Sequence, residues 1–101
     1  MDLTVADVPD RQRYEARDGS AVAGFAAYQR AASLVVFTHT EVEPAYEGKG
    51  VGSTLVRGAL DHVRDQGLDV LPLCPFVKAW IAKHPEYQDL VYRSPASTAK
   101  D

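Results

Sequence analysis

The feature that most constrains the fold of this chain is a glycine-rich segment that separates two runs of different hydrophobic periodicity. Residues 42–55 read Val-Glu-Pro-Ala-Tyr-Glu-Gly-Lys-Gly-Val-Gly-Ser-Thr-Leu, with glycine at three alternate positions. Glycine adopts positive φ and lets the backbone approach a ligand closely. The start of a helix presents free N–H groups and a positive dipole end to an anion. The segment therefore predicts a phosphate-binding loop that opens a helix.

The chain before this loop predicts three antiparallel strands. Apolar residues alternate around 12–17, recur through 21–29, and run continuously into 34–42. The pair Asp18-Gly19 between the first two runs is a strong turn signal. Connections this short join antiparallel neighbours, because parallel strands need a longer crossover.

The chain after the loop predicts a crossover unit. Apolar residues recur every four positions from Val51 to Val63, which is typical of a helix buried on one face, and Gly67 is placed to end it. Residues 68–73 form the next strand, parallel to its predecessor because a helix intervenes. A short helix at 76–83 closes the unit. The predicted fold class is α/β, with a mixed sheet of the α+β kind.

Two common phosphate-binding patterns do not fit the loop. A P-loop ends in Gly-Lys-Ser/Thr, but Lys49 is followed by Gly50. The dinucleotide fingerprint G-x-G-x-x-G needs glycine where Ser53 stands, and a chain of 101 residues leaves little room for its two-halved fold.

A third pattern, Q/R-x-x-G-x-G/A before an aliphatic helix face, resembles residues 47–52 closely. It is the acetyl-CoA pyrophosphate loop of the GNAT superfamily of N-acetyltransferases, and the one departure is Glu47 in place of Gln or Arg. Two further motifs agree with it in order and spacing. They are Phe-Thr-His-Thr-Glu-Val at 37–42, and Pro-Leu-Cys-Pro-Phe-Val at 72–77 with His-Pro-Glu-Tyr at 84–87. Together, over residues 11–92, they resemble a subgroup of short GNAT proteins that contain little more than the acetyl-CoA-binding half, a minimal GNAT fold.

The resemblance implies an acetyl-CoA-dependent N-acetyltransferase, with acetyl-CoA between two splayed strands. Its acceptor is an amine that the sequence does not specify, whether a peptide lysine, an N-terminus or a small amine. The residues expected to bind the cofactor are Glu41, Val42, Glu47, Gly48, Lys49, Gly50, Val51, Gly52, Ser53 and Cys74. The histidines and the cysteine are scattered without metal-ligand spacing, so no metal is expected.

Three residues are candidates for catalysis. His39 and Glu41 lie two apart, so they share one face of an extended strand, although a strand end that emerges into solvent looks the same. Cys74 ends a buried strand, where an isolated cysteine is usually a small core residue. A helix that begins near Phe76 favours the thiolate form of such a cysteine.

Two mechanisms and two functions stay open. Acetyl transfer is either direct, with Glu41 or His39 as general base, or passes through Cys74 as a nucleophile that His39 activates. The alternative to an enzyme is a non-catalytic acyl-CoA-binding or protein-interaction module. The chain lacks the N-terminal helical pair that usually shapes the acceptor pocket in this superfamily, which supports that alternative and otherwise implies an open acceptor site.

Composition places the chain among ordinary globular proteins, at 46% hydrophobic and 25% charged residues. A net charge of −3 gives no reason to expect nucleic acid, and no apolar run approaches the ~20 residues of a membrane span. A single cysteine favours a reducing, cytoplasmic compartment. We expect a loosely ordered lead-in at 1–10, one domain at 11–93 and a disordered tail at 94–101.

Overall fold

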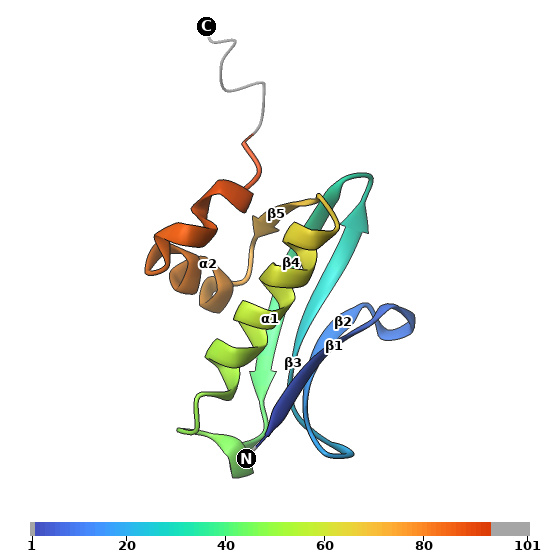
Figure 1. Cartoon of the computed structure of the whole chain (residues 1–101), viewed down its shortest axis with the longest axis vertical. Helices are drawn as coiled ribbons and strands as arrows, with labels where there is room; N and C mark the ends of the chain where they lie inside the picture. Colours follow the sequence, from blue (N-terminus) through green and yellow to red (C-terminus); the bar gives the residue numbers. More distant parts are fainter. Residues whose placement is uncertain (1, 94–101) are drawn as a thin grey trace, which may run out of the picture.

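The computed structural model describes residues 2–93 as a five-stranded sheet with its helices packed on one face (Figure 1). The strands are β1 (Leu3–Val8), β2 (Arg13–Asp18), β3 (Ala21–Ala31), β4 (Leu34–Val42) and β5 (Asp69–Pro72). The α-helices are α1 (Val51–Asp65) and α2 (Pro75–Ala82), and the 3-10 helices are η1 (Pro9–Arg11), η2 (Pro44–Tyr46) and η3 (Pro85–Leu90). The sheet order follows the sequence order, with β1 to β4 antiparallel and β5 parallel to β4. The predicted mixed α/β fold is confirmed.

The helix α1 is the crossover between β4 and β5, and it runs along the sheet (Figure 1). The apolar stripe that the sequence predicts, together with its flanking residues, is fully buried: Val51, Leu55, Val56, Ala59, Leu60 and Val63. Gly67, with φ of 70°, follows the helix and donates its amide to the Arg64 carbonyl. Burial of one face therefore holds α1 on the sheet, and a glycine in the left-handed region lets the chain turn into β5.

Residues 1–10, expected as a loosely ordered lead-in, require a correction. Leu3–Val8 pairs with β2 along its whole length, so the sheet has four antiparallel strands and not three. The reason is tertiary contact with α1. An added Cβ at Gly58 would lie 2.7 Å from Val5 Cβ, so the glycine lets this strand approach the helix closely. The predicted tail at 94–101 lies outside the described residues.

The strands β4 and β5 stay together over four residue pairs and then separate. Their pairing runs from Leu34 opposite Asp69 to Phe37 opposite Pro72. Beyond that point, the amides of both Leu73 and Cys74 donate to the Phe37 carbonyl as the chain turns into α2. A register shift in the β3–β4 ladder at the same level gives β4 one extra residue. The second half of β4 therefore has no strand beside it on the β5 side within residues 2–93, and a V-shaped opening begins there.

Within the described part of the chain, no helix is both long and apolar enough to cross a membrane.

Candidate acyl-CoA cleft

The glycine loop lies at the open end of the V, between β4 and α1 (Figure 1). Gly48 and Gly50 have φ of 77° and 78°, a left-handed conformation that glycine adopts without strain. The loop lines a hollow of about 290 Å³. Seven of the residues predicted to bind the cofactor line it: Val42, Glu47, Gly48, Gly50, Val51, Gly52 and Ser53. Glu41, Lys49 and Cys74 are outside this lining.

The first turn of α1 supplies hydrogen-bond donors to this hollow. The first bond of the helical ladder at this end runs from the Thr54 amide to the Gly50 carbonyl, over 3.1 Å. The amides of Val51, Gly52 and Ser53 precede that bond, so they have no acceptor within the helix. No side chain among residues 2–93 caps this end. Three free N–H groups at the positive end of a helix dipole suit a phosphate group.

The helix α2 closes the hollow from the other side. The Trp80 indole Nε1–H donates to the Ser53 hydroxyl over 3.0 Å, and the Phe76 ring also lines the hollow. An added Cβ at Gly52 would lie 2.8 Å from Phe76 Cζ. The absence of a side chain at Gly52 therefore leaves room for the Phe76 ring beside the loop. Sequence patterns identified neither Tyr46 nor Phe76 as lining residues, because only the fold brings them to the loop.

The open edge of β4 presents main-chain groups to the V. The Glu43 amide donates to the Ala23 carbonyl of β3 over 2.8 Å. Main-chain groups alternate sides along an antiparallel strand, so those of Glu41 also point to β3. Those of Thr40 and Val42 point to the opposite edge. The sequence predicts that the main chain of Glu41 and Val42 would face the cofactor. Val42 does face the V, but the second residue that does so is Thr40 and not Glu41.

The side chains of His39 and Glu41 lie within hydrogen-bonding distance of each other on the exposed face of β4. His39 Nε2 lies 2.7 Å from Glu41 Oε2, and both side chains are more than half exposed, at 58% and 55%. The Phe25 ring of β3 packs edge-on to the imidazole, with 6.1 Å between ring centroids. The sequence prediction that these two residues share a face is thus borne out by a direct contact. The carboxylate can orient the imidazole and stabilise it after it accepts a proton.

Cys74 lies at the start of α2, inside the V. Its side chain is 3% exposed, and Sγ lies 3.4 Å from Thr40 Oγ1. His39 is not its hydrogen-bond partner, because His39 and Thr40 are successive residues whose side chains leave β4 on opposite faces. The structure therefore brings together His39 with Glu41 and Cys74 with Thr40, rather than His39 with Cys74. Thr40 carried no sequence signal beyond its place between two candidates.

Tyr87, the tyrosine of the His-Pro-Glu-Tyr motif, packs against α1. Its hydroxyl donates to Asp61 Oδ1 over 2.6 Å and accepts from Arg57 over 3.3 Å. Burial and then the Asp61 carboxylate raise the pKa of the phenol, which opposes its ionisation. Tyr87 therefore ties η3 to the helix. Among residues 2–93, no three or more His, Cys, Asp or Glu side chains gather in a way that could hold a metal ion.

A mixed sheet that splays beside a glycine loop, with free amides at the loop, is the arrangement expected of a GNAT fold. The family model described as GCN5-related N-acetyl-transferase matches residues 13–90, so the chain belongs to this family.

The chain is also similar to curated proteins of several animals. The chain is similar to Protein NATD1 of Gallus gallus, at 32% identity over 62 residues that cover 61% of this chain and 56% of that protein. It is 33% identical over 52 residues to Protein NATD1 of Homo sapiens, which covers 52% of this chain and 46% of that protein. The chain thus spans about half the length of the curated relatives it matches.

A solved structure agrees on the fold. The NMR solution structure of a GCN5-like protein from Staphylococcus aureus matches with a TM-score of 0.68 at 21% identity, and the match covers 98% of this chain and 97% of that one. At this identity, the match supports the fold and nothing finer.

Proposed function

We propose that this chain binds acetyl-CoA in the V and transfers its acetyl group to an amine that approaches the open face of the sheet. One observation carries the proposal. The hollow lined by the amides of Val51, Gly52 and Ser53 lies at one end of the unpaired edge of β4. An anion site joined to a free strand edge suits a ligand with a pyrophosphate at one end and an amide-rich arm.

The residues divide the binding between them. The loop amides take the pyrophosphate, and Lys49, exposed on the same loop, adds positive charge. Glu47 lines the hollow, so its carboxylate turns away from phosphate or hydrogen-bonds within the loop. The main-chain groups of Thr40 and Val42 pair with the pantetheine amides as an added strand would.

Chemistry then takes place where β4 and α2 face each other. The amine nitrogen forms a bond to the thioester carbonyl carbon, the carbon–sulfur bond breaks, and CoA leaves as a thiolate. The His39–Glu41 pair accepts the proton that the amine loses. Its exposure on the open face gives an acceptor direct access. Cys74, buried beside Thr40, forms the wall of the cleft next to the reacting carbonyl.

A covalent route through Cys74 is the alternative mechanism. In it the Cys74 sulfur takes the acetyl group, CoA leaves, and the amine then displaces the sulfur. The contacts favour direct transfer. The Cys74 thiol is hydrogen-bonded to the Thr40 hydroxyl and to no basic side chain among residues 2–93, whereas His39 is hydrogen-bonded to the Glu41 carboxylate.

Two matched variants test acetyl-CoA binding. Gly50 and Gly67 both have positive φ, and an added Cβ at either position meets nothing within 4 Å. The substitutions Gly50→Ala and Gly67→Ala should therefore lose similar stability from backbone strain alone, about 1–2 kcal/mol each. Only Gly50→Ala should lose acetyl-CoA affinity in calorimetry, because only Gly50 lines the hollow.

The calorimetry, together with an assay of CoA release, decides between the functions. Equal loss of affinity in both variants, or no binding by the wild type at millimolar ligand, contradicts the proposal. Tight binding with no CoA release, over a panel of peptide and small amines, would favour the non-catalytic binding module instead.

A further inference from the structure

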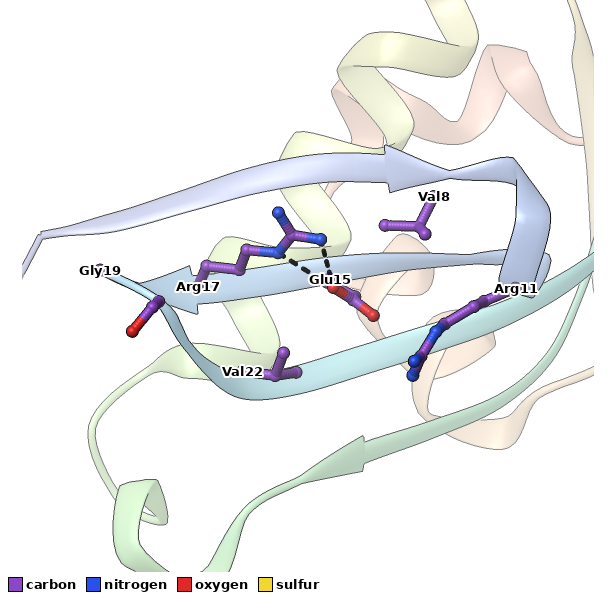
Figure 2. A pocket seen from close by; sticks show the side chains of 7 residues that line it. Val8, Arg11, Glu15, Arg17, Gly19 and Val22 are labelled. Carbon is purple, nitrogen blue, oxygen red and sulfur yellow. Dashed lines mark hydrogen bonds and ion pairs between the residues drawn. The ribbon is translucent and has the colours of Figure 1, made fainter.

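A second hollow lies on the face of the sheet opposite α1, where β1, β2 and β3 meet η1 (Figure 2). Its volume is about 380 Å³. The apolar side chains of Val8 and Val22 line it, and its charged side chains are Arg11, Glu15 and Arg17. Nothing in the cleft described above uses these residues.

Glu15 is a buried carboxylate that holds two arginines in place through hydrogen bonds. Its side chain is 3% exposed, and it accepts from Arg17 Nε and Nη2 over 2.9 and 2.7 Å and from Arg13 Nε over 2.8 Å. Arg13 also lies over the Phe25 ring, 4.4 Å from its centroid. The Nη1 groups of both arginines make no hydrogen bond to any residue from 2 to 93. Each guanidinium is therefore oriented in advance, with donors left for a ligand.

Arg11 adds a third guanidinium, which has no hydrogen-bond or ion-pair partner among residues 2–93. It ends η1, and Gln12 in the left-handed region (φ 52°) then turns the chain into β2. Figure 2 shows its side chain on the same face as Glu15. Two arginines, Arg11 and Arg17, line the hollow with one carboxylate, Glu15, and Arg13 contacts that carboxylate from beside the hollow. Positive charge is therefore in local excess on a chain whose net charge is −3. A local patch of positive charge of this kind is complementary to an anionic ligand.

The sheet register joins this hollow to the His39–Glu41 pair. Glu15 lies opposite Phe25 on β3, and Phe25 lies opposite Glu41 on β4. Directly paired residues project from the same face of a sheet, so Glu15, Phe25 and Glu41 share one face. Their face is the one away from α1, because the neighbouring Tyr14 points to α1 and its hydroxyl is hydrogen-bonded to His62. Two strand spacings of about 4.8 Å separate Glu15 from Glu41, which amounts to about 10 Å.

We infer, on the basis of the proposed function, that the hollow binds an anionic group of the acceptor while the acceptor's amine lies at the His39–Glu41 pair. The acceptor class is an amine that carries a carboxylate or phosphate about 10 Å away, a distance that three extended peptide residues span. Arg11 and Arg17 bind the anion, and Glu15 acts only by positioning Arg17 and Arg13.

The test uses the whole chain and matched capped peptides. Lys-Gly-Gly-Glu is compared with Lys-Gly-Gly-Gln, and Lys-Gly-Gly-phosphoserine separates phosphate from carboxylate as the preferred source of the anion. Binding is followed by NMR titration of backbone amides and arginine Nε signals, and acetyl transfer by CoA release. Arg11→Gln is the main variant, because an exposed residue without an internal partner can be replaced without disturbing the fold. Arg30→Gln, the same charge change near the β3–β4 turn and outside the hollow, is the control.

We expect the glutamate or phosphoserine peptide to bind about three- to fivefold more tightly than the glutamine peptide. Arg11→Gln should remove that preference, and Arg30→Gln should keep it. Equal binding of all three peptides, no binding at millimolar peptide, or equal loss in both variants overturns the inference. A preference in binding without acetyl transfer would support the anion site and contradict the proposed function. Acetyl transfer without any preference would overturn the anion site alone.

Discussion

Trp80 of α2 donates its indole N–H to the Ser53 hydroxyl in the first turn of α1, with 3.0 Å between the two atoms. Trp80 is buried and Ser53 lines the hollow beside the glycine loop. This bond joins the helix that follows β5 to the helix that follows β4, and so fixes the two walls of the V relative to each other. The stability of α2 and the shape of the proposed cofactor site are therefore linked.

Ser53→Ala should lower the free energy of unfolding by about 1–2 kcal/mol, because it leaves a buried indole N–H without an acceptor. Chemical denaturation followed by tryptophan fluorescence measures the change. Ser53→Thr keeps the hydroxyl and is the control. Equal stability of the alanine and wild-type proteins would show that solvent satisfies the indole and that the bond does not hold α2.

Gly52→Ala should weaken acetyl-CoA binding while changing stability little. The new Cβ would lie 2.8 Å from the Phe76 ring, and that ring is 45% exposed, so it can swing aside and reshape the hollow. A double-mutant cycle with Phe76→Ala measures the coupling by calorimetry. If the two substitutions act additively on affinity, the ring and Gly52 do not shape the site together.

Glu41→Gln should reduce kcat by about 100-fold, because it disrupts the His39–Glu41 pair that we propose as the general base, and a general base typically contributes that much. Cys74→Ala should stay within about threefold of wild type if transfer is direct, with acetyl-CoA affinity as the control for folding. The opposite ranking, or an acetylated Cys74 in mass spectrometry after brief mixing, would establish the covalent route.

Glu15 should make stability depend on pH in the acid range. Hydrogen bonds from Arg17 and then Arg13 hold the pKa of this carboxyl below its ordinary value of 4.5. Its contribution is therefore complete above the unfolded pKa and is lost as pH falls from there through the lower folded pKa. Glu15→Gln should remove up to about 1 kcal/mol of stability at neutral pH and flatten the curve below pH ~5. Denaturation at several pH values checks this, with the exposed Glu43→Gln as the matched loss of charge. Parallel curves for wild type and Glu15→Gln would contradict the prediction.

The sequence by itself determined the order of elements from β2 to α2 and the place of the glycine loop. Period-two and period-four patterns report which residues are buried within one element, and glycine reports where φ becomes positive, so both signals are local. That is why the stripe from Val51 to Val63 and the left-handed Gly48 and Gly50 were predictable.

The tertiary structure decided the rest. The strand β1 forms because Val5 packs against α1 at Gly58, a contact between residues 53 positions apart. The partner of Cys74 is Thr40, because the thiol enters the V from α2 while His39 leaves β4 on the other face. The arginine-lined hollow needs three strands in register. Contacts between distant segments depend on strand register and on which face a helix covers, and no local pattern encodes either.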